Sequence, residues 1–177
     1  MRLFTAITLP EPAWRHLADV QRGLPTRALR LVGSQNLHIT LKFLGEVETS
    51  GVAGVVAALS GVQIPAMRLK TGPMIDLSGR GRLNVVAASV DGGTLKLRSL
   101  FGDIEAALAT LGFVAESRKF HAHVTLARVA PRGRIHRGDL PDWTAGPEFA
   151  CGGFELMSST LAPGGAVHEI VARFTRD

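Results

Sequence analysis

Residues 36–47 of the chain have the sequence NLHITLKFLGEV, and residues 118–129 have the sequence RKFHAHVTLARV. Both stretches contain the tetrad His-x-Thr-Leu, which begins at His38 and again at His123. Chance would place roughly 0.05 copies of this pattern in a chain of this length and composition. The two copies, 85 positions apart, therefore indicate an internal duplication that produced two related halves.

The side chains around each tetrad alternate in character, which predicts a β-strand. From Leu37 to Phe43 every second residue is apolar, and the residues between them are polar. A regular strand places these two sets on opposite faces, so the histidine and threonine of each tetrad should share one face. Phe43 belongs to the apolar set, and we expect it, like Phe120 before the second tetrad, to pack in the core.

Apolar periodicity in the rest of the chain predicts more strands than helices. Most connections are too short for parallel crossovers, so we expect an α+β fold with mainly antiparallel sheets. The predicted strands are 2–9, 37–44, 62–70, 83–90, 119–129 and a closing hairpin of 149–161 against 166–174; the predicted helices are 12–24, 49–59 and 94–111; the predicted connections include 25–36, 72–82 and 131–147.

The length of 177 residues suits one domain. With one tetrad in each half, at 38–41 and 123–126, we expect residues 1–177 to form a single domain of two intertwined lobes. A pseudo-twofold axis would relate the lobes, each a mainly antiparallel sheet with flanking helices. The active-site cleft would lie between them and would contain both histidines and both threonines of the tetrads.

Two imidazoles and two hydroxyls on facing strands suit displacement at phosphorus. One histidine would take a proton from the nucleophile while the other gives one to the leaving oxygen, and imidazole titrates near neutral pH. The hydroxyls of Thr40 and Thr125 would donate hydrogen bonds to the non-bridging phosphate oxygens. One such histidine alone carries little information, whereas the matched pair predicts acid–base chemistry on a phosphate.

Basic residues exceed acidic ones in the chain and are mostly arginine. The formal net charge is +5 at pH 7, and 16 of the 20 Lys and Arg residues are Arg. Arginine binds phosphate through paired N–H donors, but a GC-rich genome also selects arginine codons, so composition leaves both explanations open. A hydrophobic fraction of 46% excludes extended disorder, and the Gly and Pro content excludes collagen.

The chain has one cysteine, Cys151, which suits a reducing compartment. It has no histidine or asparagine beside it, so we expect an inert, packed thiol. The N-terminal MRLFTAITLP lacks the apolar core of a secretory signal, and the longest uncharged run, 49–67, is interrupted by Gly, Ser and Pro. The sequence therefore predicts a cytoplasmic protein with no membrane-spanning segment.

Three residues close to the tetrads are further candidates for the site. Lys42 has the strand parity to face the cleft and attract a phosphate, or to be a solvated strand lysine. Arg128 has the opposite parity to His123, so it would contact phosphate only if the strand were irregular, and otherwise form a structural salt bridge. His121 shares a face with His123, and we expect it at the outer rim, because a metal site would need a third ligand.

Two predicted loops carry clusters of basic residues. The first contains Arg80 and Arg82, and the second contains Arg132 and Arg134. These side chains would either contact an RNA backbone or be ordinary exposed loop charges.

The motifs resemble those of the two-histidine (2H) phosphoesterase superfamily, and more narrowly the LigT-like RNA 2′,3′-cyclic phosphodiesterases. The resemblance covers nearly the whole chain: the opening RLFTAITLPE (2–11), both tetrad blocks, and the closing LMSSTLAPGGAVHEIVARF (156–174). HxTx tetrads define the superfamily, and the surrounding patterns NLHxTLxFLG and HxTLAR make the resemblance specific.

This resemblance implies metal-independent hydrolysis of an RNA or nucleoside 2′,3′-cyclic phosphate to a 2′-phosphomonoester, without a cofactor. Matched by motif, His38 would protonate the departing O3′, and His123 would act as base toward the attacking water. Thr40 and Thr125 would hold the phosphate, and Arg128 belongs to the same motif block. The partners would be RNA ends or cyclic nucleotides, bound by a monomer that needs no other protein.

Three alternatives use the same site: a nucleotide- or RNA-end-binding module without turnover, joining of RNA ends through a 2′–5′ bond, and hydrolysis of an ADP-ribose cyclic phosphate. The chain also departs from the family pattern. Ala122 replaces the proline that usually precedes the second tetrad, and Val86, Ala87 and His168 stand where aromatic residues are common. We expect these changes to affect substrate preference more than chemistry.

Overall fold

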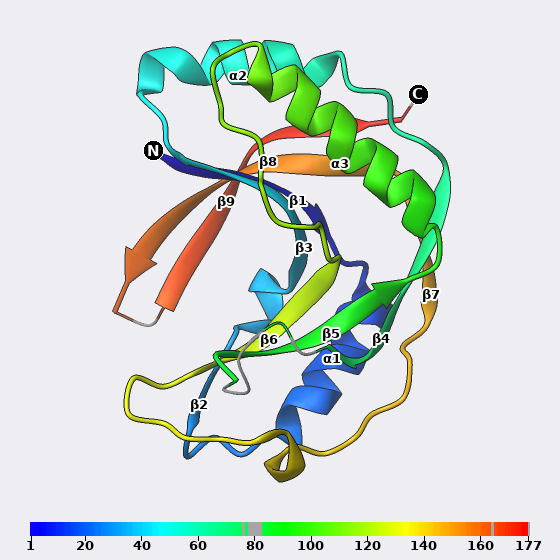
Figure 1. Ribbon diagram of the computed structural model, residues 1–177, viewed down its shortest axis with the longest axis vertical. Coiled ribbons are helices and arrows are strands. Elements are labelled where there is room, and N and C mark those ends of the chain that lie inside the picture. The colour runs from blue at the N-terminus through cyan, green and yellow to red at the C-terminus, as the bar shows by residue number, and fades with distance from the viewer. Residues whose placement is uncertain (76, 78–82, 164, 177) are drawn as a thin grey trace.

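A curled antiparallel sheet with helices packed around it forms the protein (Figure 1). The computed structural model describes residues 1–75, 77, 83–163 and 165–176. Within these residues the strands are β1 (Arg2–Thr8), β2 (Leu29–Leu31), β3 (His38–Glu46), β4 (Met67–Ile75), β5 (Val85–Asp91), β6 (His123–Val129), β7 (Glu148–Cys151), β8 (Gly153–Ala162) and β9 (Gly165–Thr175); the α-helices are α1 (Glu11–Arg22), α2 (Val52–Ser60) and α3 (Thr94–Ala109). The predicted α+β class with antiparallel pairing is confirmed.

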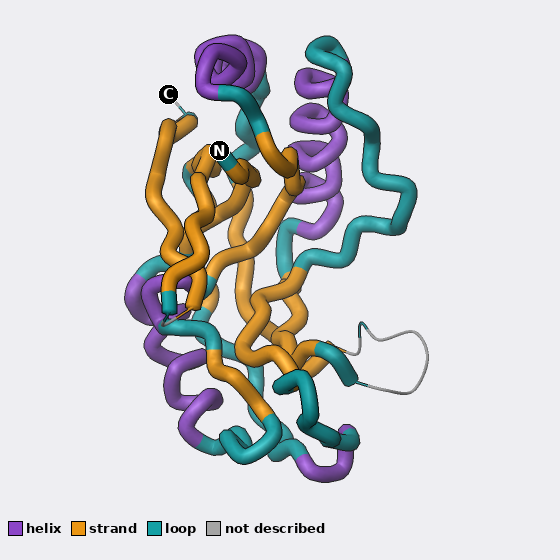
Figure 2. Tube along the Cα trace, turned by 90° about the vertical axis from the view of Figure 1, so that its left-hand side faces the viewer, coloured by secondary structure: helices purple, strands orange, loops and turns teal. Residues whose placement is uncertain are grey.

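The two strands that carry the tetrads are neighbours at the centre of the sheet. In the described residues the strand order is β7-β4-β5-β6-β3-β1-β8-β9, and the short β2 pairs with β6. β3 and β6 are antiparallel and meet at one register pair, Ile39 with Val124. Three strands of this order lie on each side of the pair, so the two related halves join into one continuous sheet (Figure 2).

The helices connect the two halves of the sheet. Helix α1 precedes β3 in the chain but contacts β6, and α3 precedes β6 but contacts β3. Each of these two helices thus contacts the tetrad strand of the other half of the chain. Helix α3 buries Leu97, Leu100, Ile104 and Leu108, at the spacing of an amphipathic helix. No helix among the described residues is both long and apolar enough to span a membrane.

Strand β4 differs from the strand predicted for 62–70. It begins at Met67, after Pro65, because proline has no N–H to donate to a ladder. It also continues through 72–75, which were predicted as loop. Pro73 is tolerated there because it lies at a shift in the register between β4 and β5.

Three other element boundaries also differ from the prediction. Strand β6 begins at His123 rather than at residue 119. The predicted hairpin strand 149–161 is divided at Gly152, so that β7 pairs with β4 and only β8 pairs with β9. Strand β2 lies in a segment predicted as a connection, because its three residues are too few to show a periodic pattern.

Candidate active site

The histidines and threonines of the two tetrads lie on one face of β3 and β6, which we call the motif face. Ile39 and Val124, the register pair between these strands, are fully buried on the opposite face. Alternation along each strand then turns the residues on either side of them to the motif face. Continuing the antiparallel register by one residue sets each histidine across from the threonine of the other tetrad, as a twofold relation requires.

Both imidazoles are oriented by the same main-chain contact. The Nδ1 atom of His38 lies 2.6 Å from the carbonyl oxygen of Asn36, and Nδ1 of His123 lies 2.8 Å from that of His121. A carbonyl oxygen only accepts hydrogen bonds, so Nδ1 carries the proton in each ring and Nε2 has the lone pair. Nε2 of His38 accepts a hydrogen bond from the Thr40 hydroxyl, at 3.0 Å.

Burial keeps both imidazoles uncharged in the free protein. It lowers the pKa of His38 to about 4, and neighbouring positive charge at Arg128 acts in the same direction. Burial also lowers the pKa of His123, again with a smaller contribution from Arg128. A phosphate anion bound between the two rings would have the opposite effect, because a nearby negative charge favours the protonated form.

Each tetrad ends in a β-bulge at its leucine. Leu41 has no register partner in β1, and Leu126 has none in β5, although the residues on both sides of each leucine are paired. Each leucine and the residue after it are both buried, which regular alternation does not allow. One extra residue reverses the alternation beyond it, so the bulges decide which later side chains reach the motif face.

Buried polar side chains hold the two bulges. The Gln21 carboxamide nitrogen on α1 donates to the carbonyl oxygens of Leu126, at 2.8 Å, and Val32, at 2.7 Å. At the other bulge, the hydroxyl oxygen of Thr5 accepts the main-chain N–H of Lys42, at 3.1 Å. Thr5 thus satisfies the Lys42 N–H that the bulge in β3 removes from the ladder. Gln21 is the donor to the Val32 carbonyl and a second donor to the Leu126 carbonyl, which also accepts the Val32 N–H.

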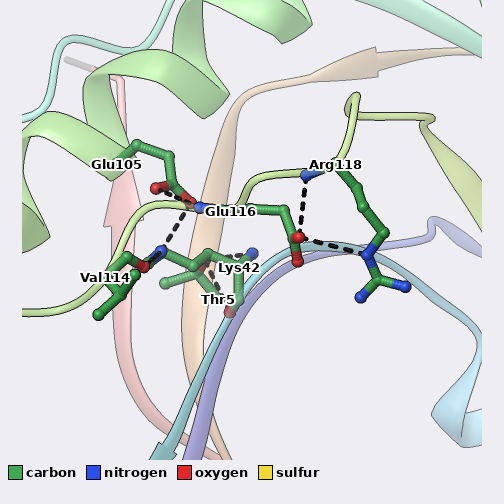
Figure 3. A network of polar contacts seen from close by, with 6 residues as sticks. All are labelled: Thr5, Lys42, Glu105, Val114, Glu116 and Arg118. Atoms are coloured by element: carbon green, nitrogen blue, oxygen red, sulfur yellow. Dashed lines mark hydrogen bonds and ion pairs between the residues drawn. The ribbon is translucent and has the colours of Figure 1, made fainter.

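Lys42 is buried in an ion pair with Glu105 (Figure 3). It therefore does not lie on the motif face, and the prediction that it attracts a phosphate there is wrong. Because of the bulge it turns inward, where its ammonium lies 2.7 Å from the carboxylate of Glu105 on α3 and 2.8 Å from the carbonyl oxygen of Val114. The same carboxylate accepts the main-chain N–H of Glu116. This buried ion pair ties β3 and α3 to the segment that leads into β6.

The bulges also reverse the predicted orientation of Arg128 and Phe43. Both come two residues after the bulged leucine, so both return to the motif face, one from each tetrad strand. Arg128 is exposed, and its charge acts on the pKa of His38 and of His123. Phe43 is 65% exposed instead of packed in the core, and its ring centroid lies 6.0 Å from that of Phe4.

A third histidine, His168 on β9, packs edge-on against His38. Their ring centroids are 5.4 Å apart, and the ring of Phe4 lies 5.1 Å from His38 and 5.0 Å from His168. Burial lowers the pKa of His168, so this ring is also uncharged at neutral pH. It supplies a ring where the family resemblance suggested an aromatic residue, whereas Val86 and Ala87 on β5 are buried and supply none.

Other predicted positions have simpler outcomes. Phe120 is half-buried and stacks on Phe101, at 4.4 Å between ring centroids, as expected of a packed residue. Ala122, in the place of the family proline, is half-buried against the core. Burial raises the pKa of the Cys151 thiol, in keeping with an inert side chain. Within the described residues, no three His, Cys, Asp or Glu side chains form a group that could hold a metal ion.

The basic loops are described only in part. Arg132 and Arg134 are exposed in the loop that follows β6. Arg80 and Arg82 lie outside the described residues.

The family model of the LigT-like phosphoesterases matches residues 7–72 and 89–168. The chain belongs to this family. It is 30% identical over 178 residues to an RNA 2′,3′-cyclic phosphodiesterase of Methanocaldococcus jannaschii, covering 97% of this chain and 98% of that one. It is also 30% identical to an RNA 2′,3′-cyclic phosphodiesterase of Thermus thermophilus, over 99% of this chain and 90% of that one.

Solved structures agree with this assignment over the whole fold. The protein TT0787 of Thermus thermophilus superposes with a TM-score of 0.85 at 27% sequence identity, covering 99% of this chain and 97% of that one. Escherichia coli LigT complexed with 3′-AMP superposes with a TM-score of 0.80 at 26% identity, with the same coverage. The family resemblance and the fold inferred from the tetrads are therefore confirmed.

Proposed function

We propose that the protein hydrolyses 2′,3′-cyclic phosphates, at RNA ends or on nucleosides, to 2′-phosphomonoesters. The observation that carries this proposal is the antiparallel pairing of the two tetrad strands at Ile39 and Val124. This pairing places two imidazoles and two hydroxyls on one face of the sheet. Relatives named RNA 2′,3′-cyclic phosphodiesterase support the same reaction. The protein is then a phosphoric diester hydrolase that uses a pair of histidines.

In this reaction a water molecule attacks phosphorus as the bond from phosphorus to O3′ breaks. Nε2 of His123 accepts a proton from the water, and His38, protonated at Nε2, gives its proton to O3′. Each histidine contributes about 10²–10⁴-fold to the rate. Because the pKa of His38 is low in the free protein, the negative charge of the bound phosphate is what favours its protonated form.

The two threonines bind the phosphate, and Arg128 adds positive charge beside it. The hydroxyls of Thr40 and Thr125 donate to the non-bridging oxygens, where negative charge grows in the transition state. In the free protein the Thr40 hydroxyl donates to Nε2 of His38, and protonation of that nitrogen frees the hydroxyl for the phosphate. Acid, base and anion donors all come from the chain, so we expect activity without a metal or cofactor.

Other exposed residues contact the rest of the substrate. The exposed ring of Phe43 supplies a surface on which a base can stack. Arg132 and Arg134, exposed beyond the end of β6, attract the phosphates of an RNA chain. One chain contributes both tetrads, which supports a monomer as the active form, and a single, unpaired Cys151 supports the reducing cytoplasm as its compartment.

The experiment is incubation of the protein in EDTA with adenosine 2′,3′-cyclic phosphate and with a short RNA that ends in a 2′,3′-cyclic phosphate. Phosphorus NMR of the products should show a 2′-phosphomonoester. A 3′-phosphate would overturn the assignment of O3′ as the leaving oxygen. Tight binding of both substrates without any product would instead indicate a nucleotide-binding module.

A further inference from the structure

Two arginines lie side by side on the motif face, beyond the second tetrad. Strand β2 pairs with β6 in antiparallel register, and Arg30 lies directly opposite Arg128. Residues directly opposite each other in an antiparallel pair project from the same face. Both side chains are exposed, whereas Leu29, next to Arg30, is buried on the other face.

This pair of like charges costs the free protein stability. Like charges directly opposite each other on neighbouring strands repel. Among the described residues, neither guanidinium lies within ion-pair distance of a carboxylate; the ion pairs there join other partners. An anion bound between the two side chains would remove the repulsion and satisfy both sets of N–H donors.

The arginine pair is close to the tetrads but separate from them. Leu126 is an extra residue in the bulge, so Arg128 lies only two strand positions beyond Thr125 although it is three residues later in the chain. At the usual rise per residue this is a distance of roughly 7 Å along the strand. Gln21 holds this geometry, since its carboxamide bonds the Leu126 carbonyl and the Val32 carbonyl just after β2. A phosphate at the tetrads and a second phosphate at the arginines can therefore be bound at the same time.

We propose that Arg30 and Arg128 form a second phosphate site, which binds the 5′-phosphate of the nucleotide whose 2′,3′-cyclic phosphate is at the tetrads. This second site rests on the proposed function, and it adds a preferred class of substrate to the proposed reaction. Within an RNA chain every terminal nucleotide has such a 5′-phosphate, whereas a nucleoside 2′,3′-cyclic phosphate lacks it. The arginine pair therefore makes the protein prefer RNA ends, and 5′-phosphorylated nucleotides, over nucleosides.

The first test compares two ligands that differ only in the 5′-phosphate, adenosine 2′,5′-bisphosphate and adenosine 2′-monophosphate, by calorimetry. The wild-type protein should bind the bisphosphate about tenfold more tightly, because one additional pair of charge-assisted hydrogen bonds changes the affinity by about this factor. In Arg30→Met this ratio should fall close to one, and in Arg30→Lys, which keeps the charge without the paired donors, it should be intermediate. Arg98→Met, which removes an exposed arginine from α3, should keep the wild-type ratio.

The second test measures thermal unfolding without ligand. Arg30→Met should raise the melting temperature, because it removes the repulsion from Arg128, whereas loss of a purely structural arginine would lower it. The proposal is overturned if Arg30→Met leaves the affinity ratio unchanged, whether both ligands bind as before or are weakened equally. Failure of the proposed function looks different: the wild-type protein would then hydrolyse neither cyclic substrate, and the affinity ratio would still report on the arginine pair.

Discussion

The carboxamide nitrogen of Gln21 lies 2.8 Å from the carbonyl oxygen of Leu126, the extra residue of the bulge in β6. Gln21 is 6% exposed, and its side chain joins α1 to the bulge that turns Arg128 toward the histidines. Replacing it by leucine leaves the Val32 carbonyl without its donor. We expect Gln21→Leu to lower the free energy of unfolding by about 2 kcal/mol, measured by urea denaturation.

The same substitution should lower kcat/KM of the folded protein by about tenfold, the equivalent of one hydrogen bond lost from the transition state. Gln63→Leu is the matched control, because Gln63 is exposed and far from either tetrad in the chain. If Gln21→Leu lost stability but kept the full kcat/KM, Gln21 would be a structural residue with no effect on the site.

The two tetrad histidines should each be essential. His38→Gln and His123→Gln remove the acid and the base in turn, and each should lower kcat for adenosine 2′,3′-cyclic phosphate by about 10²–10⁴-fold. Because the two act in one step, the double variant should be little slower than the slower single one. His16→Gln, at a half-buried position of α1 where the ring bonds the Thr144 carbonyl instead of a tetrad residue, serves as control. Full activity in both single variants would rule out catalysis by the pair.

Much of the fold is predictable because its elements have strong periodic signals. Residues 94–109 have an apolar stripe at helical spacing, and β1, β3 and β5 have patterns of strand length, so each was located to within a few residues. The signal failed where it was short or interrupted. Strand β2 has three residues, and β4 contains a proline at a register shift that sequence periodicity alone does not show.

The site divides in the same way. The spacing within each His-x-Thr pair is enough to predict that the histidine and the threonine share one face of their strand, because this depends only on alternation over three residues. Alternation places Lys42 and Phe43 on the wrong faces and leaves the orientation of Arg128 open, because a bulge adds one residue and reverses parity beyond it. The one available signal was the equal spacing of Phe43 and Arg128 from their histidines, five residues in each tetrad. Gln21 and Arg30 lie in other segments, and only strand and helix packing bring them to the bulge.

The low pKa of His38 should make stability depend on pH. The folded pKa is about 4 and the usual value is 6.5, so below pH 6.5 the unfolded chain binds a proton that the folded protein does not. The stabilising contribution of the neutral ring is therefore complete above pH 6.5 and is lost as the pH falls toward 4. Between pH 7 and pH 5 the loss from His38 should be about 2 kcal/mol.

Urea denaturation of the wild type and of His38→Gln at both pH values measures this contribution. The wild type should lose more stability than the variant on acidification, and the difference between the two losses is the contribution of His38. His123 and His168 also have lowered pKa values, so both proteins should keep some dependence in the same direction. Equal losses in the wild type and the variant would show that His38 titrates normally in the folded protein.

The buried pair of Lys42 and Glu105 should behave as a structural pair. Lys42→Met leaves the Glu105 carboxylate buried without its partner, at a cost of about 3–5 kcal/mol in the free energy of unfolding. The double variant Lys42→Met with Glu105→Leu removes both charges and should recover most of that loss. It should also keep the wild-type kcat/KM, because the ammonium turns away from the motif face. If the double variant kept full stability but lost much of its kcat/KM, Lys42 would instead contribute to phosphate binding.

Phe43 should affect binding of the base more than the chemical step. Its ring is 65% exposed on the motif face, beside Phe4, so its removal costs little stability. Base stacking on an aromatic side chain is worth about 1–3 kcal/mol, so Phe43→Ala should raise KM for adenosine 2′,3′-cyclic phosphate by about tenfold and change kcat little. Phe43→Tyr, which keeps the ring, should restore the wild-type KM. Ribose 2′,3′-cyclic phosphate, which has no base, distinguishes the causes: an equal rise in its KM would mean that Phe43 shapes the phosphate site instead of contacting the base.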